Sequence, residues 1–100
     1  MTVEFHPEAY EEMLESARYY DERSAGLGGD FLTAGEDTTG RIQQFPDAAP
    51  IEMRGVRKRF VAGFPFTVLY EYERQENRIF IAAVMHQRRR PGYWRHRLHR

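Results

Sequence analysis

The feature that most constrains the fold of this chain is a change in hydrophobic period near residue 50. Up to Pro46, apolar residues recur every three or four positions, which is the period of an amphipathic helix. After the segment PDAAP (46–50) they recur every second position, which is typical of strands. Helical segments followed by strands predict an α+β domain, with a helical hairpin packed on a small antiparallel sheet.

Two helices are expected in the first half. Pro7 suits the first turn of a helix that we expect at residues 8–23. The glycine-rich segment SAGLGGD (24–30) interrupts the pattern, and Asp30 is a candidate cap for a second helix that Pro46 stops. A break of this length predicts an antiparallel helical hairpin. A short extended segment at residues 3–5 precedes it.

Three strands are expected in the second half. Residues 53–62 predict a basic strand, and residues 66–73 alternate between apolar and polar, which predicts a half-buried strand. Residues 79–85 are almost entirely apolar, which indicates an interior strand buried on both faces. The expected order is β-α-α-β-β-β in a single domain spanning residues 1–100, with a basic C-terminal tail at 87–100.

Composition excludes several classes of protein. The chain has no cysteine, which excludes disulfides and thiolate metal sites and fits a reducing cytoplasm. No apolar run reaches the roughly 18–20 residues that a membrane-spanning helix needs, so no membrane partner is expected. The acidic start, MTVEFHPEAYEEM, does not resemble a signal peptide.

The formal net charge of zero conceals a strong separation of charge. Residues 1–50 hold eleven acidic and three basic residues, a net charge of −8, and residues 51–100 hold twelve basic and four acidic residues, a net charge of +8. The segment HQRRRPGYWRHRLHR (86–100) has six arginines and no Asp or Glu. This separation predicts two oppositely charged faces and an anionic partner for the basic one. The alternative is that the two halves neutralise each other within the fold.

The chain resembles the RelE/ParE toxins of bacterial type II toxin–antitoxin systems. The resemblance rests on the order of segments, on YYDERSAGLGGDFL and FPDAAPIEMRGVRKRFVAGFPFTVLYEYE, and above all on the ending AAVMHQRRRPGYWRHR. That ending follows the pattern H-x-x-R-x-P-x-x-W-x-x-R that such proteins often show. The family implies either poisoning of DNA gyrase, as in ParE-like members, or ribosome-dependent cleavage of mRNA, as in RelE-like members. It also implies neutralisation by a co-expressed antitoxin.

Cleavage of RNA would need proton transfer and stabilisation of a charged phosphorane. The catalytic candidates in that case are His86 as acid or base, with Arg59 and Arg89 as guanidinium donors. Residues predicted to bind phosphate or another target are Arg54, Arg57, Arg88, Arg90, Tyr93, Trp94 and Arg97. Two alternatives stay open: His86 as a strand-end histidine without a catalytic role, and Trp94 as an anchor of the tail against the sheet. No histidine spacing indicates a metal site, and no cofactor is expected.

The gyrase interpretation requires only a docking surface, which a basic, aromatic tail provides. It is favoured because the basic region offers no obvious second acid–base group, although Glu52 is a candidate. A third possibility is a non-toxic member that only binds its antitoxin or regulates its own promoter. The expected partners are an acidic antitoxin and either gyrase or the ribosome with mRNA, and the toxin could form a homodimer or a heterotetramer with the antitoxin.

Overall fold

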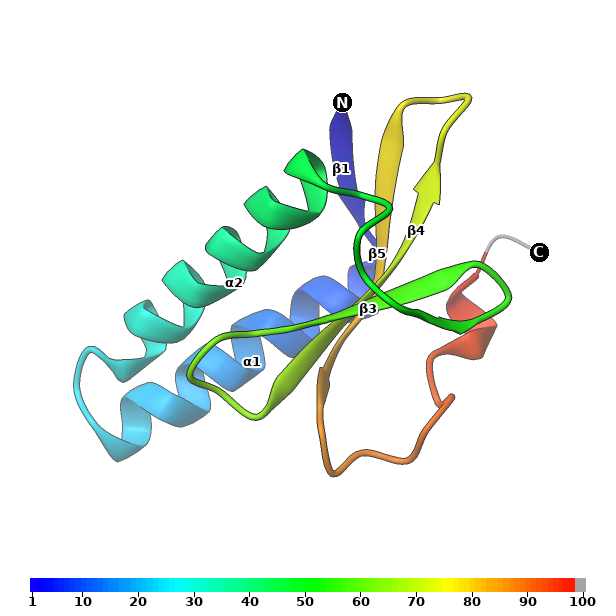
Figure 1. Cartoon of the computed structure of the whole chain (residues 1–100). Helices are drawn as coiled ribbons and strands as arrows, with labels where there is room; N and C mark the ends of the chain where they lie inside the picture. Colours follow the sequence, from blue (N-terminus) through cyan, green and yellow to red (C-terminus); the bar gives the residue numbers. More distant parts are fainter. Residues whose placement is uncertain (99–100) are drawn as a thin grey trace.

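The computed structural model of the protein describes residues 1–98 (Figure 1). Positions 99 and 100 of the predicted basic tail lie outside the described residues. The expected α+β fold with an N-terminal helical hairpin is confirmed. The elements are β1 (Thr2–Phe5), α1 (Pro7–Arg23), α2 (Leu27–Gln44), β2 (Ile51–Met53), β3 (Val56–Phe60), β4 (Phe66–Glu73), β5 (Arg78–His86) and the short 3-10 helix η1 (Arg95–Arg97).

The five strands form one sheet in the order β1-β5-β4-β3-β2. The pairs β2–β3, β3–β4 and β4–β5 are antiparallel, but β1 pairs with β5 in parallel. The sheet is therefore mixed, whereas a wholly antiparallel one was expected, because nothing in the four residues of β1 indicates which strand they pair with. The predicted interior position of residues 79–85 is confirmed: β5 lies between β1 and β4.

The helical hairpin is closely packed at its turn. The second helix begins at Leu27, earlier than expected, and Asp30 lies in its first turn; the cap position belongs to Gly26, whose φ is +87°. The backbone N–H of Gly28 donates to Oδ1 of Asp21 at 2.7 Å. A Cβ atom at Gly28 would stand 2.3 Å from the carbonyl oxygen of Ala17. Only glycine permits this approach of the two helices.

The basic strand expected at residues 53–62 is in fact a hairpin of two short strands. Met53 pairs with Val56, and Arg54 and Gly55 form the two-residue turn between β2 and β3 with φ angles of +46° and +82°. Positive φ at both central residues is the signature of a type I′ turn, which suits the twist of antiparallel strands. Arg54 therefore lies in a turn and not in a strand. The composition of this segment resembles a strand, but Gly55 permits a turn within it.

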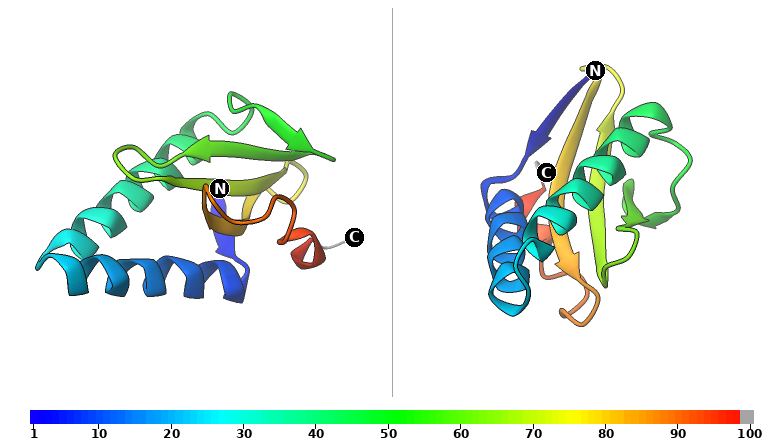
Figure 2. Two further views of the ribbon diagram at one scale, coloured as in Figure 1. Left: turned by 90° about the horizontal axis from the view of Figure 1, so that it is seen from below. Right: turned by 90° about the vertical axis from the view of Figure 1, so that its left-hand side faces the viewer.

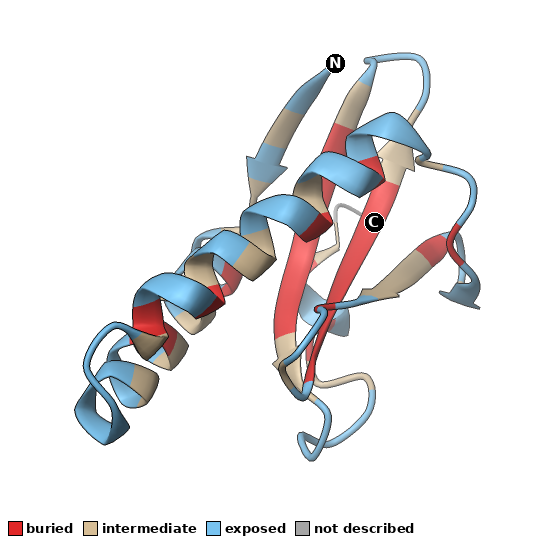
Figure 3. Ribbon diagram, turned by 60° about the vertical axis from the view of Figure 1, so that its left-hand side comes forward, coloured by how far each residue is buried: buried red, intermediate tan, exposed pale blue. Residues whose placement is uncertain are grey.

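The sheet is covered on both faces along β4 and β5 (Figure 3). One face packs on the helices through a core cluster that includes Phe66, Val68 and Tyr70. The other face packs on the segment after β5, where Leu69 belongs to a second cluster with Trp94. The expectation that residues 66–73 are half-buried is therefore wrong, because the C-terminal segment folds back and covers the second face (Figure 2).

Candidate functional site

The loop after β5 presents three consecutive exposed arginines, Arg88, Arg89 and Arg90, which we call the basic loop. Its backbone is held at the start: the N–H of Gln87 donates to the carbonyl of Pro65 at 2.9 Å, and the N–H of Arg89 to the carbonyl of His86 at 2.9 Å. The guanidinium of Arg89 lies 3.9 Å from the centre of the Tyr93 ring. Within residues 1–98, none of the three guanidiniums forms an ion pair. The basic loop is therefore a positively charged surface that the fold does not neutralise.

A cavity of about 610 Å³ lies beside the basic loop, between α1 and the end of β5. His86 and Arg89 both line it, so the fold brings these two candidates together. The His86 ring meets Phe66 edge-on at 5.1 Å. Its Nδ1 accepts the N–H of Arg88 at 3.0 Å, which places the proton of the neutral imidazole on Nε2. The remaining lining residues are Glu12, Glu15, Ser16, Tyr19, Tyr20, Arg23 and Val84.

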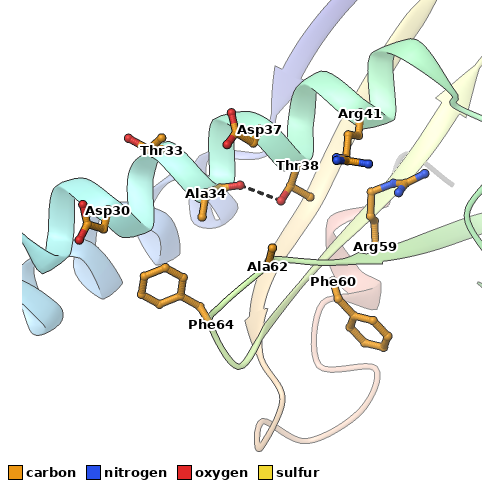
Figure 4. A pocket seen from close by; sticks show the side chains of 10 residues that line it. All are labelled: Asp30, Thr33, Ala34, Asp37, Thr38, Arg41, Arg59, Phe60, Ala62 and Phe64. Carbon is orange, nitrogen blue, oxygen red and sulfur yellow. Dashed lines mark hydrogen bonds between the residues drawn. The ribbon is translucent and has the colours of Figure 1, made fainter.

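Arg59, the third catalytic candidate, lies elsewhere. It lines a separate cavity of about 550 Å³ between α2 and β3 (Figure 4). An aromatic cluster separates the two cavities: Phe64 lines the second cavity and lies 5.1 Å, between ring centres, from Tyr20, which lines the first. The predicted trio is thus divided, and only His86 and Arg89 share a site.

Tyr93, Trp94 and Arg97 form an anchor for the C-terminal segment. Trp94 is only 1% exposed and packs in the second core cluster, as expected if it anchors the tail. Arg97 is 6% exposed. Its Nη1 and Nη2 donate to the two carboxylate oxygens of Glu12 at 2.9 and 3.0 Å, and Tyr93 donates its hydroxyl to the same carboxylate at 2.6 Å. The Trp94 ring and the two Nη atoms of Arg97 are therefore occupied within the fold, whereas Nε of Arg97 is buried without a hydrogen-bond partner in residues 1–98.

This anchor also caps the open edge of β5. Pairing with β1 ends at Phe5 opposite Ile81, so the backbone beyond it has no strand neighbour on that side. Glu12 accepts the N–H of Val84 at 3.1 Å, and Arg97 donates to the carbonyl of Ala82 at 3.1 Å. Two side chains thus provide the hydrogen bonds that a neighbouring strand would supply.

Protonation follows from these contacts. Burial, helped by the hydrogen bond and the charge of Glu12, raises the pKa of the Tyr93 hydroxyl well above its ordinary value. Burial alone would lower the pKa of Arg97, but the hydrogen bonds that Arg97 donates to Glu12 and the negative charge of Glu12 raise it. Burial alone would raise the pKa of Glu8, but the nearby Arg97 holds it below its ordinary value. Arg97 therefore stays charged and Tyr93 stays protonated at neutral pH.

The arginines of the β2–β3 hairpin do not extend the basic loop. Arg57 donates from Nη1 to the carbonyls of Asp47 at 3.0 Å and Ala49 at 2.7 Å, and its Nη2 lies 3.6 Å from the Asp47 carboxylate. It therefore holds the connection between α2 and β2. Arg54 is exposed in the hairpin turn. The charge separation predicted one basic face, but the structure does not gather the arginines in this way, because carboxylates distant in sequence neutralise Arg57 and Arg97 while the basic loop stays unpaired.

The residues predicted from sequence did not include several that line these two cavities. The pair Tyr19 and Arg23 lines the first cavity, with the guanidinium 4.1 Å from the ring centre. Their spacing of four along a helix could have indicated this contact. Arg41 lines the second cavity beside Arg59. Only the fold reveals that proximity.

Residues 1–98 hold no group of three or more His, Cys, Asp or Glu side chains arranged to bind a metal ion. It also contains no helix with the length and apolar character needed to span a membrane.

Comparison with solved structures finds the same fold in another protein. A structure described as "Chromosomal ParDE TA system from P. aeruginosa" superposes with a TM-score of 0.62 at 16% identity, covering 86% of this chain and 95% of that one. The model of the family described as "ParE toxin of type II toxin-antitoxin system, parDE" matches residues 3–91. The chain belongs to this ParE toxin family. No curated protein matches the sequence at a significant level.

Proposed function

We propose that this ParE-family toxin inhibits bacterial growth by poisoning DNA gyrase and that an acidic antitoxin neutralises it. The observation that carries the proposal is the basic loop, whose three exposed guanidiniums have no ion-pair partner within residues 1–98. Unpaired arginines in one loop favour an anionic partner, because each can grip a phosphate or carboxylate through two parallel hydrogen bonds. Gyrase working on DNA offers both kinds of group.

Poisoning gyrase by docking requires a binding surface and no catalytic residues. The ring of Tyr93 supports Arg89, and the hydroxyl of Tyr93 is fixed by Glu12, so the loop is braced against α1. A braced loop loses less conformational entropy on binding than a free one. The adjacent cavity, lined by Tyr19 and Phe66, adds apolar surface beside the charge. Charge next to an aromatic recess is well suited to a protein–DNA complex.

Cleavage of mRNA is the second candidate function, and one observation favours it: His86 and Arg89 share a cavity with Glu15. That arrangement offers an acid–base group, a phosphate ligand and a carboxylate. Against it, Arg59 lies in the other cavity. The other candidate carboxylate, Glu52, forms an ion pair with Lys58 at 3.1 Å on the β2–β3 hairpin. The docking function therefore fits the geometry better.

The test is induction of this chain in a bacterium that lacks the antitoxin, together with purified gyrase. We expect filamentous growth and a DNA-damage response, and inhibited supercoiling or accumulated cleaved DNA in the purified reaction. Rapid arrest of translation with cut mRNA would instead establish the nuclease. Normal growth would indicate a non-toxic member that only binds its antitoxin. Arg18→Ala, at an exposed position of α1, serves as a matched control for substitutions in the basic loop.

A further inference from the structure

Two arginines converge in the cavity between α2 and β3 with no carboxylate between them. Arg41 comes from the last turn of α2 and Arg59 from β3, and both line this cavity. In Figure 4 their guanidinium ends approach the same end of the cavity from opposite sides. Within residues 1–98 neither forms a side-chain hydrogen bond or an ion pair. Two like charges placed together in this way are stabilised by an anion that bridges them.

The partial burial of Arg59 strengthens this argument. Its Nε atom is buried and has no hydrogen-bond partner within the described residues, and the same is true of Nε of Arg97. The two differ in their Nη atoms, because those of Arg97 bind Glu12 whereas those of Arg59 have no side-chain partner in residues 1–98. Buried polar atoms in proteins are nearly always paired, so an unpaired one calls for an explanation. Arg57, two residues earlier on the same strand, shows the usual solution, since Asp47 and two carbonyl oxygens surround its guanidinium. Arg59 lacks such a partner, which is what a binding site for an external anion requires.

The walls of the cavity restrict what this anion can be. Ala34, Ala62 and Phe64 contribute apolar surface, and Phe60 at its edge is 63% exposed. The hydroxyl of Thr38 is already used by the carbonyl of Ala34 at 2.8 Å. A ligand that places one charged group beside apolar groups fits such walls, and a highly charged one does not.

The surrounding charge disfavours nucleic acid. Besides Arg41, α2 carries Asp30, Glu36 and Asp37, and Asp30 and Asp37 also line the cavity. Figure 4 shows Asp37 pointing away from the two guanidiniums and Asp30 at the far end. A run of phosphates along α2 would meet these carboxylates, whereas a single carboxylate between the arginines would not.

We propose that Arg41 and Arg59 form a carboxylate subsite, which receives one Asp or Glu side chain from an amphipathic, acidic segment of the antitoxin. Apolar residues of the same segment pack on Phe60 and Phe64. This inference rests on the proposed neutralisation by an antitoxin, and it names the place and the chemistry of that contact. The subsite is distinct from the basic loop, so the toxin binds its antitoxin and its target through different arginines.

The experiment measures binding of this chain to the product of the gene adjacent to its own, by calorimetry. The variants are Arg41→Gln, Arg59→Gln and both together, with Arg18→Gln as the matched control on α1. The double variant should weaken binding at least about tenfold, because it removes both partners of a desolvated carboxylate. The control should stay within about twofold. Lysine at both positions should restore part of the affinity, since the charge returns without the planar fork.

The outcomes separate the subsite from the function. Binding of the unaltered chain with no loss in the folded double variant would overturn the subsite and leave the antitoxin proposal standing. Absence of binding by the unaltered chain would overturn both. If Arg59→Gln prevents folding, as judged by circular dichroism, Arg41→Gln alone decides, because its position is exposed on a helix. An equal loss of affinity for a 20-nucleotide single-stranded DNA would make this a phosphate site and overturn the peptide assignment.

Discussion

Glu12→Ala is expected to destabilise the fold strongly, because it removes the carboxylate that neutralises the buried Arg97. The side chains of Arg97 and Glu12 are 4% and 15% exposed, and two hydrogen bonds of 2.9 and 3.0 Å join them. The substitution also leaves the N–H of Val84 and the hydroxyl of Tyr93 without their acceptor.

The expected loss in the free energy of unfolding follows from these contacts. Removing one partner of a buried ion pair costs about 3–5 kcal/mol. Glu8 still lies 3.3 Å from Nη2 of Arg97 and would offset part of that cost, so we expect about 3 kcal/mol. For a domain of this size each 1 kcal/mol lowers Tm by about 4–8 °C, which predicts a fall of about 12–24 °C.

Urea unfolding and thermal melting followed by circular dichroism measure this change. Glu11→Ala, at an exposed neighbouring position, is the matched control and should cost less than about 0.5 kcal/mol. A double-mutant cycle with Arg97→Met isolates the pair, and its coupling free energy should exceed about 1 kcal/mol. If Glu12→Ala cost no more than its control, the carboxylate would not be neutralising a buried charge and the reasoning would fail.

Three further outcomes are expected. Alanine at all of residues 88–90 should leave Tm within about 2 °C but weaken binding to gyrase–DNA and reduce its dependence on salt; an unchanged salt slope would show that the basic loop touches no polyanion. His86→Ala should leave gyrase poisoning intact, whereas a nuclease would lose about 10²–10⁴-fold in mRNA cleavage, which primer extension on cellular mRNA measures. Because the pKa of Tyr93 is raised from 10.0, its contribution to stability is present below pH 10 and is lost as the pH rises towards its folded pKa. Tyr93→Phe should flatten that decline in urea titrations by up to about 1.4 kcal/mol per pH unit, and an unaltered slope would contradict the assignment.

Local patterns predicted the elements whose causes are local. The helix at 7–23 follows from its apolar spacing and Pro7, and the interior position of β5 follows from the apolar run at 79–85. The β2–β3 turn was missed because a strand-like composition surrounds Gly55. The double-sided burial of β4 was missed because it depends on Trp94, which lies more than twenty positions further along the chain.

The candidate site was predictable only in part, because it too depends on residues that are distant in the sequence. Three consecutive arginines at 88–90 predict an exposed positive charge, and the structure places them on the surface. Whether an arginine is neutralised depends on carboxylates that the fold brings from elsewhere. Asp47 is ten positions from Arg57, and Glu12 is 85 positions from Arg97. No local pattern contains those pairings.

The side-chain cap on β5 bears on how copies of the chain behave towards one another. An interior strand that loses its neighbour half-way along exposes donors and acceptors to which any extended polypeptide can add. Glu12 and Arg97 occupy those groups at Val84 and Ala82 and so deny them to a second molecule. A molecule in which Glu12 and Arg97 are not yet in place would expose the backbone N–H of Val84 and the carbonyl of Ala82. We expect self-association to begin at this edge of β5.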